Sequence, residues 1–120
     1  MYKNNGVFSN NRLVRMLAVL MILLLSSCTT FKLGRDFDVQ AFEAIAKVGE
    51  TSKTLVRSAL GAPKNTGFSL NADGERLLEW VYFYGSGKMT SMDNAELKIL
   101  QIRFDDKGIV RSYNWTNSGK

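Results

Sequence analysis

The longest apolar run of the chain lies near its N-terminus, from Met16 to Leu25. Lys3, Arg12 and Arg15 precede this run, and small polar residues follow it from Ser26 onward. A basic segment, a short apolar segment and then small residues are the layout of an export signal. The run has about half of the roughly 20 apolar residues that a helix needs to span a bilayer, so a permanent transmembrane anchor is the less favoured interpretation.

Apolar positions at helical spacing predict two short helices further along the chain. The first has Val39, Phe42, Ile45 and Ala46 on its apolar face, and the second has Leu55, Val56, Ala59 and Leu60. Asp36 or Asp38 can cap the first helix, and Thr51 can cap the second. Gly61 can end the second helix in a left-handed conformation, and Pro63 prevents the helix from continuing.

Beyond the second helix the pattern changes to the alternation of β-strands. A turn is predicted at 71–74 and a polar connection at 85–94, and 105–108 is the clearest hairpin signal of the chain. The three predicted strands are Leu77–Tyr84, Leu97–Phe104 and Ile109–Trp115. The pattern therefore predicts an α+β fold of two layers, in which two short helices pack on a three-stranded antiparallel sheet in the order α-α-β-β-β.

The four residues Leu25-Ser26-Ser27-Cys28 resemble the lipobox of bacterial lipoprotein signals. The resemblance implies that Cys28 receives a diacylglyceryl group as a thioether, and that cleavage after Ser27 frees its amine for a further acyl chain. Two or three acyl chains hold a protein firmly at a membrane. The alternative is an ordinary secretory signal followed by a stray cysteine, but the single thiol of an exported protein then has no evident use.

These signals divide the chain into four parts. We expect a lipoprotein signal peptide at 1–27, the lipidated cysteine and a polar tether at 28–35, the α+β domain at 36–116 and a tail at 117–120. Removal of the leader leaves roughly 90 residues, which suffice for one domain. Thr29 stands where an aspartate commonly directs such lipoproteins to the inner membrane, which favours the periplasmic face of the outer membrane.

The chain offers little for catalysis or for binding nucleic acid. Its formal charge of +5 includes three leader cations, so the remainder carries about +2, spread without runs, and no nucleic-acid partner is inferred. Because there is no histidine, Ser-His and Cys-His nucleophile pairs and histidine-containing zinc sites are excluded. Asp105 and Asp106 are turn formers in this interpretation. We therefore predict a protein that is not an enzyme and has no catalytic, cofactor or metal site.

Function is instead expected on the sheet face that the helices leave open. If Trp80 and Tyr82 face the helices, then Phe83 and its alternate neighbours point outward, as does Arg103 on the next strand. In the last strand either Arg111 and Tyr113 or their neighbours point outward, because a one-residue bulge at the turn would exchange the two sets. The candidate partner-binding residues are Phe83, Arg103, Arg111 and Tyr113.

Several short motifs recur in the order and spacing of a known family. They are Gly49-Glu50-Thr51, Val56, Leu60-Gly61-Ala62-Pro63, Trp80-Val81-Tyr82 and Phe104-Asp105-Asp106-Lys107-Gly108. Here the chain resembles the SmpA/OmlA (BamE-like) family of small outer-membrane lipoproteins, from about Phe37 to Trp115. The family fold is again two helices on one face of a three-stranded antiparallel sheet.

The resemblance implies a lipid-anchored periplasmic interaction module that supports outer-membrane β-barrel protein assembly or envelope integrity. Its partners would be membrane lipid through acylated Cys28 and an envelope protein, such as a β-barrel assembly complex. Two alternatives stay open. One is an osmotic-stress lipoprotein of the OsmE type, and the other is an inhibitor or ligand-binding lipoprotein, since the same layout resembles the repeat unit of β-lactamase inhibitory proteins.

Overall fold

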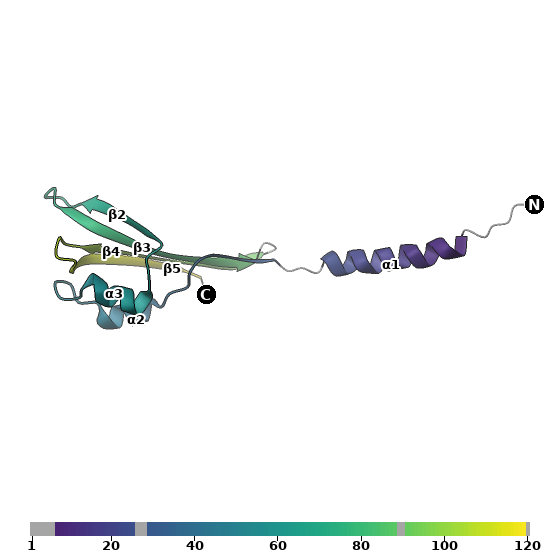
Figure 1. The fold of residues 1–120 in the computed structure, drawn as a ribbon, viewed down its shortest axis with the longest axis horizontal. Coiled ribbons are helices and arrows are strands. Elements are labelled where there is room, and N and C mark those ends of the chain that lie inside the picture. The colour runs from purple at the N-terminus through teal and green to yellow at the C-terminus, as the bar shows by residue number, and fades with distance from the viewer. Residues whose placement is uncertain (1–6, 26–28, 89–90, 120) are drawn as a thin grey trace, which may run out of the picture.

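A computed structural model describes residues 7–25, 29–88 and 91–119 of the 120-residue chain. The molecule is elongated, with extents of 95 × 26 × 24 Å, and helix α1 lies apart from the sheet at one end (Figure 1). The elements in chain order are α1 (Val7–Leu25), β1 (Thr30–Gly34), α2 (Val39–Ile45), α3 (Lys53–Leu60), β2 (Asn65–Leu70), β3 (Arg76–Lys88), β4 (Ser91–Phe104) and β5 (Val110–Ser118).

Strand β3 lies inside an antiparallel sheet of five strands. On one side it pairs with β4, which in turn pairs with β5. On its other side it pairs with two short strands, β2 along its first half and β1 along its second half. The pairing with β2 begins at Val81 and the pairing with β1 ends at Tyr84, so Tyr82 and Phe83 have no register partner on this side.

The predicted fold class of two short helices on a three-stranded sheet is wrong. The described residues form three helices and a five-stranded antiparallel sheet. Helix α1 occupies the predicted leader, and the two additional strands are β1 and β2. Each of these strands has only two apolar residues at alternating positions, such as Phe31 and Leu33 in β1, which is a weak local signal. They are strands because β3, at 13 residues, is long enough to pair with both.

Two predicted connections are therefore replaced by regular structure. Residues 29–35 were expected to be an aperiodic tether, but Thr30–Gly34 is hydrogen-bonded into the sheet as β1. Residues 85–94 were expected to be a polar connection, but β3 continues to Lys88 and β4 begins at Ser91. The predicted turns at 71–74 and 105–108 are confirmed, since they join β2 to β3 and β4 to β5.

Helix α2 begins and helix α3 ends where capping chemistry predicts. The Asp38 carboxylate accepts hydrogen bonds from the backbone N–H groups of Gln40 and Ala41, which satisfies donors that the first turn of α2 leaves free. Gly61 ends α3 at a φ of 80°, and its N–H donates to the Arg57 carbonyl. Two helix boundaries proposed from sequence, Asp38 and Gly61, are thus confirmed.

Thr51 does not cap α3, as the sequence suggested. Ser52 is the cap, and its hydroxyl accepts from the N–H of Leu55. Thr51 is buried, its hydroxyl donates to the Ile45 carbonyl at 2.6 Å, and the same oxygen accepts from the Lys47 N–H at 2.9 Å. Through these two hydrogen bonds, its side chain stabilises the connection between α2 and α3.

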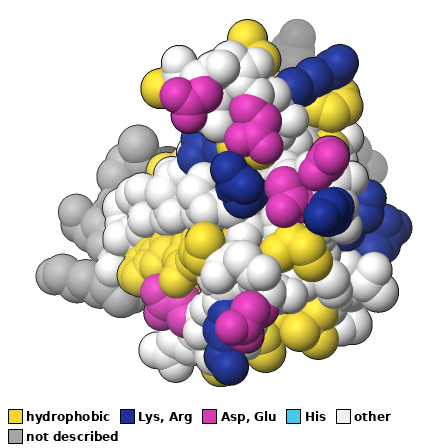
Figure 2. All heavy atoms as spheres, turned by 90° about the vertical axis from the view of Figure 1, so that its left-hand side faces the viewer, with side chains coloured by type: hydrophobic (Ala, Val, Ile, Leu, Met, Phe, Trp, Pro, Cys, Tyr) yellow, Lys and Arg dark blue, Asp and Glu magenta, His cyan; other side chains and the backbone are white. Residues whose placement is uncertain are grey.

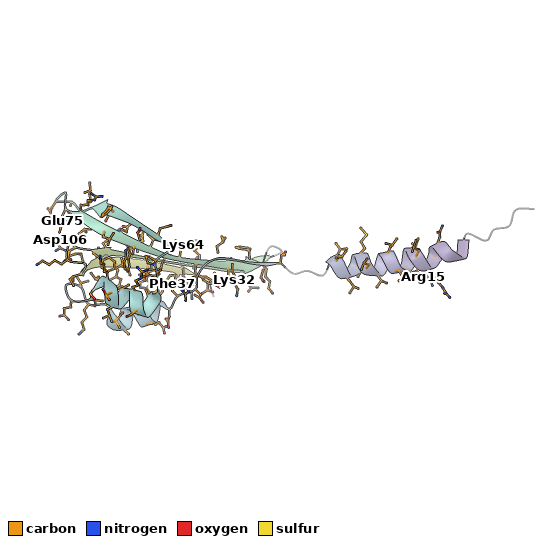
Figure 3. The ribbon with its side chains drawn as sticks, viewed as in Figure 1. Arg15, Lys32, Phe37, Lys64, Glu75 and Asp106 are labelled. Carbon is orange, nitrogen blue, oxygen red and sulfur yellow. The ribbon has the colours of Figure 1, made fainter. Side chains whose placement is uncertain are left out.

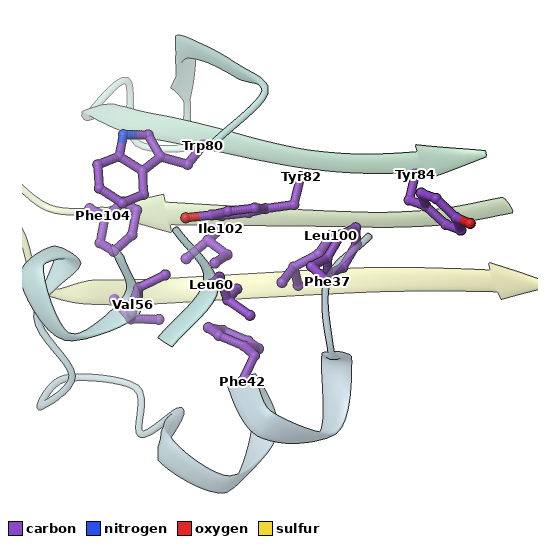
Figure 4. Close-up of a cluster of buried hydrophobic side chains, with 11 residues drawn as sticks. Phe37, Phe42, Val56, Leu60, Trp80, Tyr82, Tyr84, Leu100, Ile102 and Phe104 are labelled. Carbon is purple, nitrogen blue, oxygen red and sulfur yellow. The ribbon is translucent and has the colours of Figure 1, made fainter. Parts of the chain in front are cut away.

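The core lies between these two helices and one face of the sheet, the inner face (Figure 4). The sheet contributes Trp80, Tyr82 and Tyr84 from β3, Leu100, Ile102 and Phe104 from β4, and Val110 from β5, while Phe37, Phe42, Val56 and Leu60 close the other side. Trp80 packs edge-on against Phe104 with ring centroids 4.9 Å apart. The predicted inward positions on β3 and β4 are confirmed.

Strand β5 contains a bulge that decides which of its side chains face the helices. Ser112 pairs with Arg103 but Val110 pairs with Phe104, so Arg111 is the extra residue. Because of this extra residue, Val110 before the bulge and Tyr113 after it both lie on the inner face.

Tyr113 and Trp115 lie opposite inward-facing residues of β4 and belong to the inner face. The Tyr113 ring packs edge-on against Phe42 with centroids 5.0 Å apart, and the Trp115 indole donates to the Glu43 carboxylate at 2.7 Å. The alternative in which Tyr113 points outward is therefore wrong.

Helix α1 covers most of the predicted leader. No helix among the residues that the structure describes is long and apolar enough to cross a membrane. Cys28 and the expected cleavage position before it lie outside the described residues, so lipidation and cleavage there stay predictions.

Candidate docking face on the sheet

The face of the sheet turned away from α2 and α3, here called the outer face, is not covered by another element of the described chain. Because side chains alternate along a strand, the residues next to each inward-facing residue point to this face. Its members include Phe31 and Leu33 of β1, Leu77, Glu79, Val81 and Phe83 of β3, Leu97, Ile99, Gln101 and Arg103 of β4, and Ser112, Asn114 and Thr116 of β5.

The half of the outer face at which β1 joins the sheet, here called the apolar half, consists of Phe31, Leu33, Phe83, Leu97 and Ile99. Phe31 is 40% exposed and Leu33 is 56% exposed. Both lie against glycines, since a Cβ on Gly87 would be 2.9 Å from the Phe31 ring and one on Gly85 would be 3.9 Å from the Leu33 Cβ. Gly87 therefore leaves room for the Phe31 ring across β3, whereas the contact of Leu33 at Gly85 is an ordinary one.

The rest of the outer face, here called the polar half, carries a chain of polar contacts across three strands. Arg103 forms an ion pair with Glu79 at 3.0 Å, and its guanidinium donates to Asn114 at 3.4 Å. The Asn114 amide in turn donates to Gln101 at 2.9 Å. These cross-strand contacts hold the polar side chains in defined positions on the surface.

At the hairpin end of the sheet, acidic and basic side chains are interspersed (Figure 2). Here Arg111 forms an ion pair with Glu75 at 3.1 Å. Arg111 is the bulged residue of β5 and has no register partner on β4. Its side chain instead contacts Glu75 in the 71–75 turn. The charge on this end is mixed, in contrast to the apolar half.

The four predicted partner-binding residues are only partly brought together. Phe83 lies in the apolar half and Arg103 in the polar half. Arg111 lies at the hairpin end, and Tyr113 packs under α2 on the inner face. The proposed patch of Arg111, Tyr113 and the following aromatic on the outer face is therefore not formed.

Sequence reasoning missed the contribution of β1 and of the first half of β4. Phe31 and Leu33 lay in the segment predicted as a tether, although their spacing of two residues is a strand signal. Leu97 and Ile99 lie in the part of β4 that was predicted as a strand, so their outward position follows from the same alternation. No local signal pointed to the pairing of β1 with β3.

Among the described residues, two ionisable groups have clearly shifted pKa values. Burial raises the pKa of Tyr82 to about 12, although nearby Arg57 opposes the shift, and its hydroxyl donates to the Gly61 carbonyl at 2.8 Å. The hydrogen bond to Asp36 at 2.9 Å raises the pKa of Lys98. Neither arrangement joins a nucleophile to a base, and within the described ranges no three metal-binding side chains gather.

Comparisons with protein-family models, with curated proteins and with solved structures found no match for this chain.

Proposed function

We propose that this protein is a lipid-anchored module that docks on an envelope protein through the outer face of its sheet and performs no catalysis. In this proposal, acylated Cys28 holds the chain at the periplasmic face of the outer membrane. The docked partner belongs to the machinery of outer-membrane assembly or envelope integrity, as the motif resemblance to BamE-like lipoproteins suggests.

The observation that carries the proposal is the composition of the uncovered outer face. Protein interfaces combine an apolar centre that contains aromatic residues with a surrounding rim of polar groups. The apolar half supplies Phe31 and Phe83, and the polar half supplies the ordered ion pair between Glu79 and Arg103. Fixed polar groups give a partner directional contacts, which a lipid surface would not require.

The position of β1 links docking to anchoring. Phe31 is three residues after Cys28, so an extended chain places it within about 10 Å of the lipidated residue. Since β1 is hydrogen-bonded to β3, the anchor would hold the sheet itself and not a loose tether. The proposal therefore expects the partner to be bound close to the membrane surface.

Cys28→Ala tests the anchor. In the wild type we expect cells to incorporate a fatty-acid analogue into the protein and to retain it in the membrane fraction. In Cys28→Ala we expect no incorporation and an uncut precursor, because the thiol that accepts the lipid is gone. Metabolic labelling followed by gel analysis measures both.

Ser58→Ala serves as the control, because this exposed serine of α3 lies far along the chain from the signal. It should label and be cut as the wild type is. Normal labelling of Cys28→Ala would overturn the lipoprotein part of the proposal.

A further inference from the structure

A hollow of about 300 Å³ opens at the sheet edge where β1 has ended and β2 has not yet begun. The chain segments before α2 and after α3 form its walls, and β3 forms its floor. In Figure 3, Phe37 and Lys64, which both line the hollow, lie on either side of this part of β3. Phe83 of the apolar half also lines the hollow, whereas no residue of the polar half does.

The inner part of the hollow is apolar. Phe37, Leu60 and Tyr82 line it, and each is less than a tenth exposed. The rings of Phe37 and Tyr82 lie 5.8 Å apart. Because the Tyr82 hydroxyl already donates to the Gly61 carbonyl, the floor offers mainly ring surface to a ligand.

The mouth of the hollow is cationic. Arg35 and Lys64 line it, and among the ion pairs of the described residues neither has a carboxylate partner. The one acid in the lining, Asp36, is neutralised by Lys98 at 2.9 Å. Two exposed cations thus stand beside an apolar floor, with no acid left to balance them.

We propose that this hollow binds a small carboxylate that carries a short apolar group. The guanidinium of Arg35 matches a carboxylate in shape and charge, and Lys64 adds a second positive charge. The apolar group would lie against Phe37 and Leu60. A volume of about 300 Å³ lies at the lower end of the range for small-molecule sites, which suits a small ligand.

The probe for this site is 3-phenylpropionate, and its neutral isostere 3-phenylpropionamide is the matched control ligand. The full chain in phospholipid nanodiscs is titrated by isothermal calorimetry, with empty nanodiscs as the blank. We expect a millimolar dissociation constant for the carboxylate, as is usual for ligands of this size, and binding about tenfold weaker for the amide.

Three variants test whether 3-phenylpropionate binds in the hollow. Arg35→Gln with Lys64→Gln should raise the dissociation constant about fivefold or more. Ala62→Trp should abolish binding by filling the hollow, since Ala62 is exposed and lines it. Lys53→Gln with Lys107→Gln removes the same charge near the other end of α3 and should leave binding unchanged.

Equal binding of the carboxylate and the amide, or equal loss in both double variants, would overturn the proposal. The absence of any binding by the folded wild-type chain would overturn it as well. Circular dichroism of each variant separates a lost site from a lost fold.

Discussion

Gly61 ends α3 in a backbone conformation that residues with a side chain rarely adopt. Its φ of 80° and ψ of −165° fall in a region that is essentially restricted to glycine. We predict that Gly61→Val lowers the free energy of unfolding by about 1 to 3 kcal/mol, because a branched side chain is forced into this region. Urea denaturation of the folded chain measures the change.

Gly67 provides the control for this substitution. It lies in β2 at an ordinary φ, and a Cβ there would meet nothing within 4 Å. Gly67→Val should therefore be neutral or slightly stabilising, since a branched residue suits a strand. Equal effects of the two substitutions would show that the Gly61 conformation is not strained for other residues.

Tyr82 makes stability depend on pH in the alkaline range. Its pKa is raised to about 12 in the folded chain, compared with 10 for a free tyrosine. Below pH 10 both states keep the phenol proton, and between pH 10 and 12 the unfolded state loses it first. The contribution of Tyr82 is therefore fully present below pH 10 and is lost as the pH rises toward 12.

Tyr82→Phe isolates this contribution. At pH 8 the variant should be about 1 kcal/mol less stable than the wild type, because the hydrogen bond to the Gly61 carbonyl is lost. As the pH approaches 12 this difference should shrink or change sign, by up to about 2 kcal/mol. A difference that stays constant between pH 8 and 11.5 in urea denaturation would contradict the raised pKa.

Among the elements, the bulge in β5 places Tyr113 on the inner face, whereas the alternation of β3 places Phe83 on the outer face. Both side chains are partly buried, but Tyr113 packs edge-on against Phe42 and against the core under α2. We predict that Tyr113→Ala lowers the free energy of unfolding by about 2 to 4 kcal/mol, and Phe83→Ala by about 1 kcal/mol. Chemical denaturation of both variants would contradict the assignment if Phe83→Ala were the more damaging.

Local sequence signals were sufficient to predict those elements whose structure depends on residues that are close together in the chain. The apolar spacing of α2 and α3, the cap at Asp38, the stop at Gly61 and the turn at 105–108 all follow from residues next to one another in the chain. The alternation in β3 and β4 likewise identified the buried face. These features need no knowledge of distant contacts.

Features that depend on distant pairing could not be predicted in the same way. Strand β1 has two outward apolar residues and becomes a strand only because the second half of β3 is free to pair with it. The facing of Tyr113 depends on the bulge at Arg111, which has no distinct sequence signal. Phe31 and Leu33 of the candidate site were missed for the first reason, and Tyr113 was misplaced for the second.

For the whole molecule, the outer face changes character along its length. The apolar half lies at the end of the sheet at which β1 joins it, and the polar half follows toward the hairpin end. A lipid at Cys28 would therefore bring the apolar half close to the membrane and leave the charged hairpin end further away. A partner that contacts both the apolar half and the polar half would therefore bind in one orientation.

The central claim, that the outer face docks on an envelope protein, is tested most directly by photo-crosslinking in cells. A photoreactive phenylalanine derivative replaces either Phe83, on the outer face, or Leu55, which is 45% exposed on α3. Gel analysis of purified adducts then compares the two positions. We predict a protein adduct of one discrete mass from position 83 and none from position 55. A protein adduct from position 55 alone, only lipid adducts from position 83, or no adduct from either position would contradict the account.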